Sequence, residues 1–289
     1  MRYLQNETIA AEDMRDLKLR IRPLVLRRTK SEILKELPPK TETAVKLEFD
    51  EQQKRIYRDI ALSWNEKVRE SVLKLGESQS QVIMLTALLR LRQVCSDPAA
   101  IPNSQYEGTP PKVSVLTDAL KSITESGESA VVFTQFIHTF ERIKRDLARE
   151  AVPCYSLSGK SSRQEREKSL QGFQECKKGA VMLMTLKTGG VGLNLVKAAY
   201  VFHLEPWWNP AVENQATDRT YRIGQTRPVQ VYRYIMRESV EEKIEVLKSR
   251  KAKTFDAVFC ETEEAQGQTP SHTVLTQQDF NYLLSTGGP

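Results

Sequence analysis

Short apolar runs alternate with amphipathic stretches from residue 112 to residue 252, and this rhythm predicts repeated strand–helix units. Val181–Met184 is continuously apolar, which is typical of a strand buried on both faces. Strands are predicted at residues 130–133, 154–157, 180–184, 199–204 and 229–236, and helices at residues 115–123, 137–151, 162–173, 210–221 and 239–252. Units of this length predict an α/β fold, in which helices cover both faces of a parallel sheet.

The pattern before residue 105 is different, because helical spacing dominates it. One strand is predicted at Thr43–Phe49, where polar and apolar residues alternate as in a half-buried strand. Asp50 and Gln53 then predict a capping box at the start of a long helix that ends near Gly76. A second helix is predicted at residues 79–95.

Composition shifts divide the chain into three parts. Residues 1–105 are expected to form a mainly helical segment, and the composition of Asn103–Pro111 is that of a linker. Residues 112–260 are expected to form the α/β lobe. Residues 261–289 are expected to be a polar, flexible tail, with a short terminal helix at residues 275–284.

Composition and charge fit a globular protein without fixing its partners. Of the 289 residues, 39% are hydrophobic and 28% are charged, so the chain can bury an ordinary core. The net charge of +6 is compatible with nucleic-acid contact but does not require it. Basic residues cluster between Lys18 and Lys30, where a nucleic-acid surface and a solvated helix face fit equally well.

The four cysteines and three histidines are scattered without a C-x-x-C pair. This spacing argues against a metal site and gives no disulfide framework, so it favours a reducing, intracellular compartment. No apolar run approaches the about 18 residues of a membrane span, and the N-terminus lacks the apolar stretch of a signal peptide. Met1 leads directly into a charged helical pattern, which indicates a piece of a longer protein.

Candidate ligand-binding residues follow the strands predicted at residues 180–184 and 199–204. Glycines cluster at residues 189–192, where backbone N–H groups can approach a phosphate closely. The helix that Pro210 begins carries polar residues three or four positions apart, which share one face: Gln215, Asp218, Arg219 and Arg222. A doubly cationic face just beyond the ends of parallel strands is where α/β folds bind anionic ligands.

Two apparent phosphate-binding motifs each lack a glycine that the motif requires. Gly159-Lys160-Ser161 is similar to the end of a P-loop, but Cys154 stands where that loop requires a glycine. The glycines at residues 189–192 lack the third glycine of a dinucleotide fingerprint. Residues 158–161 instead predict either a turn that presents hydroxyl and N–H groups to a DNA phosphate or a plain helix cap at Ser161 or Ser162.

These motifs resemble the second RecA-like lobe, or helicase C-terminal domain, of SWI/SNF-type DNA translocases in helicase superfamily two. The most specific string is DRTYRIGQ, within residues 215–225, which are similar to the family's motif VI. Residues 185–195 are similar to motif V and residues 132–136 to motif IV. Ser158-Gly159 followed by Arg166, RRTK at residues 27–30 and ELPPK at residues 36–40 extend the resemblance over about residues 20–250.

The resemblance implies roles for individual residues. Arg219 and Arg222 are expected to be catalytic arginine fingers on the γ-phosphate of ATP, since a delocalised guanidinium suits the charge of a phosphoryl-transfer transition state. Residues expected near the nucleotide are Gly190, Gly192, Asn194, Gln215 and Asp218. Residues expected to contact DNA are Thr134, Gln135, Ser158, Gly159, Ser161, Thr185, Lys187 and Trp208. The structural alternative for the arginines is a salt-bridge network around Asp218.

Trp207 and Trp208 are adjacent, so both rings cannot face one core and at least one is expected near the surface. The resemblance places Trp208 against DNA, whereas the family is often acidic where Trp207 stands, which leaves the role of Trp207 open. Packing of either ring beneath a loop is the alternative.

Hydrolysis of ATP also requires a P-loop lysine and a magnesium-binding acidic pair in a strand-borne D-E-x-H string, and the sequence contains neither motif. The resemblance therefore implies that an N-terminal RecA-like lobe outside this chain binds most of the ATP and Mg²⁺, and that the chain alone is inactive. With that lobe, the protein is expected to move along double-stranded DNA and remodel protein–DNA complexes, in the cytoplasm or nucleoid of a bacterium or the nucleus of a eukaryote. The alternative is a stand-alone, non-catalytic RecA-like module that binds DNA or protein.

Overall fold

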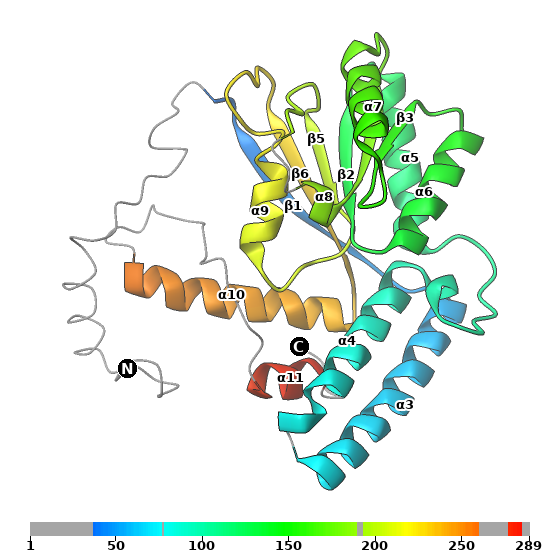
Figure 1. Cartoon of the computed structure of the whole chain (residues 1–289), viewed down its shortest axis with the longest axis vertical. Helices are drawn as coiled ribbons and strands as arrows, with labels where there is room; N and C mark the ends of the chain where they lie inside the picture. Colours follow the sequence, from blue (N-terminus) through cyan, green and yellow to red (C-terminus); the bar gives the residue numbers. More distant parts are fainter. Residues whose placement is uncertain (1–36, 77, 190–192, 260–276, 285–289) are drawn as a thin grey trace.

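A six-stranded sheet forms the centre of the computed structural model, which describes residues 37–76, 78–189, 193–259 and 277–284 (Figure 1). The strand order is β1-β6-β5-β2-β4-β3, and every neighbouring pair is parallel. The strands are β1 (Lys40–Leu47), β2 (Ala130–Thr134), β3 (Cys154–Leu157), β4 (Val181–Thr185), β5 (Tyr200–His203) and β6 (Val229–Met236). The predicted parallel sheet is therefore confirmed.

Helices lie on both faces of this sheet, as the sequence predicts (Figure 1). The α-helices of the described ranges are α3 (Glu51–Leu75), α4 (Gln81–Ser96), α5 (Pro111–Glu125), α6 (Ile137–Arg149), α7 (Arg163–Glu175), α8 (Leu186–Gly189), α9 (Pro210–Thr217), α10 (Val240–Phe259) and α11 (Gln277–Leu284). Two short 3₁₀ turns, η2 (Ser78–Ser80) and η3 (Pro98–Ala100), flank α4.

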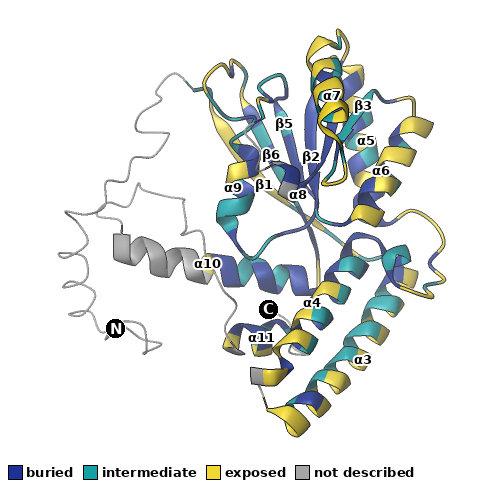
Figure 2. Ribbon diagram, viewed as in Figure 1, coloured by how far each residue is buried: buried dark blue, intermediate teal, exposed yellow. Residues whose placement is uncertain are grey.

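Strand alternation gives the sheet two separate cores, because successive side chains point to opposite faces. Val132 and its neighbours on one face pack against α5 and α6, through side chains such as Leu116 and Ile143. Val131 and its neighbours on the other face pack against α7 and α9, through Phe173 and Ala216. Figure 2 shows the central strands β2 and β4 buried, while the edge strand β1 and the outer sides of the helices are exposed.

Helices α3 and α4 form a hairpin beside the sheet, and α10 and α11 pack against α4 (Figure 1). A third apolar cluster fills this junction, with Leu88 of α4, Ile244 of α10 and Phe280 of α11 among its members. The segment before residue 105 is thus mainly helical where it is described. Its strand β1, however, pairs with β6 from Lys40↔Val229 to Leu47↔Met236 and is an edge of the lobe's own sheet.

The division into residues 1–105, 112–260 and 261–289 stays a prediction. Strand β1 crosses this division, because it lies in the first part of the chain but pairs within the sheet of the lobe. The predicted half-buried strand at residues 43–49 is observed as β1, which is mostly exposed because it lies at an edge. The basic cluster between Lys18 and Lys30 and most of the C-terminal tail lie outside the described residues. Over the ranges that are described, no helix combines the length and apolar character needed to cross a membrane.

The start of α3 differs from the predicted capping box. Asp50 is the N-cap, and its side chain accepts the Gln53 backbone N–H at 2.7 Å. The Gln53 side chain does not return to Asp50, because it is buried and donates to the Val94 and Cys95 carbonyls at 2.7 and 3.3 Å. This glutamine therefore joins the beginning of α3 to the end of α4. A full capping box occurs instead on α7, between Ser162 and Glu165.

Candidate functional site

The predicted DNA-contacting residues other than Trp208 gather at the carboxyl ends of β2, β3 and β4. Thr134 and Thr185 end adjacent strands and lie in register, and Ser158 follows β3. In a parallel sheet these ends share one edge, so the structure brings the three segments together. Thr185 is nearly buried, with its hydroxyl 2.6 Å from that of Thr188. Lys187 lies in α8, but its side chain is outside the described atoms.

Glu205, which the sequence reasoning missed, organises the end of β2. Its buried carboxylate accepts the Thr134 hydroxyl and the Gln135 backbone N–H, both at 2.9 Å, and it also accepts the Ser96 hydroxyl. Thr134 has no exposed surface, so its burial does not favour direct contact with DNA. Gln135 is half-buried and remains the accessible member of this pair.

The turn at residues 158–161 lies at the N-terminus of α7. Ser161 accepts the Ser158 backbone N–H at 3.0 Å, Ser158 accepts the Lys160 backbone N–H at 3.3 Å, and Gly159 is exposed. Ser162 is the helix cap, which agrees with the plain-cap alternative. The same turn still presents Gly159 and Lys160 to solvent, so the cap and a phosphate contact are compatible.

The two tryptophans stack on each other, with ring centroids 3.9 Å apart. Trp207 packs against the cluster on the sheet face and Trp208 against the cluster at α4, α10 and α11, so the rings face different cores and both are half-buried. The guanidinium of Arg92 lies 5.0 Å from the Trp207 ring and 5.1 Å from the Trp208 ring. Arg92 also donates to Gln135 Oε1 at 2.6 Å and to the Pro206 carbonyl at 2.9 Å. This buried arginine therefore fixes the tryptophan loop to α4.

The prediction that Arg219 and Arg222 share a helical face is wrong. Helix α9 begins at Pro210 as predicted, but it ends at Thr217, and Asp218 is its C-cap. Beyond it the chain turns, with the Arg219 N–H bonded to the Ala216 carbonyl at 3.2 Å. Residues 218–225 are called the arginine turn from here on.

A buried tertiary contact accompanies the early end of α9. His203 Nε2 lies 2.9 Å from the Thr217 hydroxyl, and the His203 ring stacks on Phe133. Burial, together with the charges of Arg233 and Lys248, lowers the pKa of His203 from 6.5 to about 3, so its imidazole is neutral. The Arg219 carbonyl then accepts the Leu195 N–H at 3.0 Å, which connects the turn to the segment before β5.

The arginine turn lies away from the carboxyl ends of the strands. Its bonds run to residues 193–198, the approach loop, which precedes β5. Arg219 and Arg222 are both half-buried, and no hydrogen bond or ion pair of the Arg222 guanidinium occurs within the described ranges. Asp218 and Arg219 do have interactions of their own. The arginine turn therefore lies toward the amino end of β5, whereas Thr134, Ser158 and Thr185 lie at the carboxyl ends of their strands.

The other predicted nucleotide-proximal residues are placed in part. Asn194 lies exposed in the approach loop, and its carbonyl accepts Gln174 Nε2 at 2.9 Å. Gln215 is exposed on α9. Gly190 and Gly192 lie outside the described residues. Among the residues that are described, no group of three or more His, Cys, Asp and Glu side chains could hold a metal ion.

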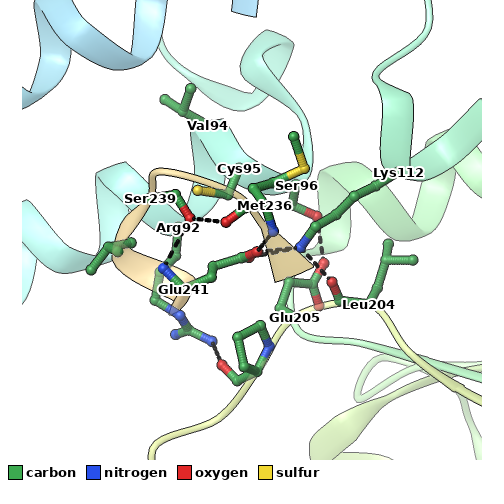
Figure 3. A network of polar contacts seen from close by, with 12 residues as sticks. Arg92, Val94, Cys95, Ser96, Lys112, Leu204, Glu205, Met236, Ser239 and Glu241 are labelled. Carbon is green, nitrogen blue, oxygen red and sulfur yellow. Dashed lines mark hydrogen bonds and ion pairs between the residues drawn. The ribbon is translucent and has the colours of Figure 1, made fainter. Parts of the chain in front are cut away.

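Buried charges beneath the site form a network that sequence reasoning also missed (Figure 3). Lys112 at the start of α5 pairs with Glu241 of α10, and neither side chain is exposed. Glu213 of α9 accepts the Trp207 backbone N–H at 2.6 Å and pairs with Lys248 of α10 at 2.9 Å. The local sequence indicates this network only at Arg92, which is a charged residue among the buried positions of α4.

Comparison with known proteins gives two family matches and several relatives. Residues 111–224 match the helicase conserved C-terminal domain, and residues 3–100 match the SNF2-related domain. An uncharacterized ATP-dependent helicase of Mycoplasma pneumoniae is 36% identical over 227 residues, which cover 78% of this chain and 21% of that protein. DNA repair protein RAD5A of Arabidopsis thaliana is 38% identical over 152 residues, 53% of this chain and 15% of that protein.

The solved structures include a similar fold bound to nucleic acid. The Sulfolobus solfataricus SWI2/SNF2 ATPase core in complex with double-stranded DNA is 30% identical, with a TM-score of 0.63 over 88% of this chain and 53% of that one. The chain spans between 21% and 26% of the length of the first curated relatives it matches.

Proposed function

We propose that this chain, which belongs to the SNF2 family of helicase-like proteins as their RecA-like C-terminal lobe, is the second motor lobe of an ATP-dependent translocase on double-stranded DNA. The observation that carries the proposal is the separation of two polar surfaces on one lobe. One follows the carboxyl ends of β2, β3 and β4, and the other is the arginine turn. A motor lobe needs both, since one surface holds DNA while the other completes the nucleotide site.

The residues of the arginine turn fit a triphosphate. Arg222 offers a guanidinium that forms no bond within the described ranges, and Arg219 lies three residues away. When bound between the lobes, ATP supplies a γ-phosphoryl group whose negative charge these arginines would stabilise. Gln215 adds an exposed polar contact, and Asp218 is proposed to orient the arginines.

The described side chains fit a magnesium ion less well than they fit a triphosphate. The adjacent acidic residues Asp50 and Glu51 start helix α3, where Asp50 is engaged as the cap, and they are not part of a strand-borne D-E-x-H string. We therefore assign most of the ATP and Mg²⁺ binding to the N-terminal RecA-like lobe of the same protein, and we expect this chain alone to be inactive.

The DNA-facing surface is suited to phosphate contacts rather than to base recognition. Gln135, the turn at residues 158–161, Lys187 and the exposed part of Trp208 would touch the backbone of one strand, which fixes register without reading sequence. The proposed activity is movement along duplex DNA that remodels protein–DNA complexes, inside the cell, in the nucleoid or the nucleus. The relatives described as DNA repair proteins are compatible with this role.

Displacement of the third strand from triplex DNA by the intact two-lobe protein tests the proposal. We expect ATP-dependent displacement by the unmodified protein and by Arg149→Ala, a change to an exposed arginine on α6. We expect none from Arg222→Ala. If the intact protein binds DNA but never displaces the strand, the lobe is instead a non-catalytic binding module.

A further inference from the structure

The side chain of Gln225 joins the arginine turn to the approach loop. It is 5% exposed, and its Nε2 donates to the carbonyls of Val196 at 3.1 Å, Ala198 at 2.9 Å and Thr220 at 3.3 Å. Its Oε1 accepts the Arg227 backbone N–H at 3.0 Å. One amide group thus contacts the loop before β5, the arginine turn and the chain that enters β6.

The main chain around Gln225 strengthens this connection. The Gln225 N–H donates to the Arg222 carbonyl at 2.9 Å and closes a tight turn, in which Gly224 adopts a φ of 98° that favours glycine. The Leu195 N–H donates to the Arg219 carbonyl at 3.0 Å. Both arginines therefore have their backbone carbonyls bonded within the same small assembly.

A primary amide is the only neutral side chain that meets all of these demands at once. It provides two N–H donors for several carbonyls and one acceptor for an amide N–H. A carboxylate of the same shape would face those carbonyls without a donor, and a thioether would leave them unpaired. The buried position excludes water that could replace the missing bonds.

We propose that Gln225 is a positioning residue, which holds the main chain of Arg219 and Arg222 against the approach loop so that both guanidinium groups keep a fixed direction. This proposal rests on the proposed function of the arginine turn. In this proposal Gln225 touches neither nucleotide nor DNA, so the loss of Gln225 acts only through the two arginines. A displacement of about 1 Å at a catalytic group can lower a rate by about 10²-fold.

The test measures steady-state ATP hydrolysis by the intact two-lobe protein with saturating duplex DNA. Gln225→Met removes the donors at similar length, and Gln225→Glu keeps the shape but removes the donors. Gln171→Met on α7 is the matched control, since the side chain of that exposed glutamine donates to Glu175 on its own helix. We expect kcat to fall by about 10- to 100-fold in both Gln225 variants, with KM for ATP and Kd for DNA nearly unchanged, and no effect in the control.

A double-mutant cycle separates positioning from simple loss of stability. In a background that carries both Arg219→Ala and Arg222→Ala, Gln225→Met should reduce kcat by less than about twofold, because both groups that it positions are already absent. Hydrogen exchange of the Leu195 amide in the intact protein should become faster in each Gln225 variant. A kcat loss that is fully additive in the background lacking both arginines overturns the positioning role, as does an unchanged exchange rate.

These measurements distinguish the positioning role of Gln225 from the proposed function of the arginine turn. If Arg222→Ala hydrolyses ATP at the normal rate, the proposed function fails, and the positioning role falls with it. If Arg222→Ala is inactive while both folded Gln225 variants retain normal kcat, only the positioning role is overturned. If Gln225→Met does not fold, Gln225→Glu and the exchange measurement still decide.

Discussion

The Lys112 ammonium lies 2.6 Å from Glu241 Oε2, and neither side chain reaches solvent (Figure 3). Lys112 also donates to the Leu204 carbonyl at 2.7 Å, and Glu241 accepts the Met236 N–H at 2.9 Å. Burial raises the pKa of the Glu241 carboxyl, while Lys112 and the Met236 N–H oppose that rise. The pair thus links the start of α5, the end of β5 and the start of α10.

Removal of one partner should therefore destabilise the fold strongly. Lys112→Met leaves the Glu241 carboxylate buried and unpaired, and we expect a loss of about 3–5 kcal/mol in the free energy of unfolding. Lys112→Met combined with Glu241→Met should recover most of that loss, because two apolar side chains can replace a buried pair. Urea unfolding measures both variants. Lys121→Met, which breaks an exposed pair with Glu150, should change little. Equal effects of Lys112→Met and Lys121→Met would contradict this account.

His203 should make stability depend on pH. Its pKa is about 3 in the folded protein against 6.5 unfolded, so the unfolded chain binds the extra proton between these values. The contribution is complete above pH 6.5 and is lost as pH falls toward about 3. The free energy of unfolding should fall by up to about 1.4 kcal/mol per pH unit from this group.

The measurement compares urea unfolding at pH 7 and about pH 5 in the unmodified chain and in His203→Gln, which can still bond to Thr217. His203→Gln should lose stability less steeply over this range. His138→Gln, at an exposed site beside Asp97, is the control. Identical pH dependence in all three proteins would show that His203 does not titrate as expected.

The two arginines should matter for turnover far more than for folding. In the intact protein, Arg219→Ala and Arg222→Ala should each lower DNA-stimulated hydrolysis by about 10³- to 10⁵-fold. Lysine at either position should restore little, since it lacks the planar fork of a guanidinium. Phosphate release and the melting temperature are measured for each variant. A lower melting temperature with normal turnover would favour the structural salt-bridge alternative around Asp218.

DNA binding by this chain alone should be weak and sensitive to salt, because it depends on phosphate contacts. Fluorescence anisotropy with duplex DNA at two salt concentrations should show affinity falling as salt rises. Ser158→Ala and Lys187→Ala should weaken binding to all sequences alike. Phosphate release by the same chain should stay at background even with saturating DNA. Binding that ignores salt, or turnover near that of an intact translocase, would contradict the proposed division between lobes.

The elements that the sequence predicted well are those fixed by local pattern. The apolar run Val181–Met184 and the cap at Asp50 each report on a few neighbouring residues, and both are observed. The end of α9 is different, since it is accompanied by a bond from Thr217 to His203 in another element. The periodicity of residues 210–221 does not indicate that contact, because His203 lies outside these residues.

Buried charges were also beyond local reasoning. Lys112 and Glu241 are 129 positions apart, and each alone reads as an ordinary exposed residue near a helix start. Gln53 shows the same limit, because a capping box was the better local prediction, yet its side chain bonds to carbonyls 41 and 42 positions away. The DNA and nucleotide residue types were recognisable, but the position of the arginine turn beside the approach loop depends on how the chain returns from α9 to β6.

The pairing of β1 with β6 also determines when the sheet can be completed while a ribosome synthesises this chain. Partners such as Lys40 and Val229 are separated by nearly the whole lobe, and at ~5–20 residues per second the later strand follows the earlier by roughly 10–40 s. Throughout that interval β1 lacks the partner that it has in the described sheet, and the apolar side of α4 that carries Leu88 lacks its packing against α10. The described sheet is therefore completed late in synthesis, when β6 enters between β5 and β1.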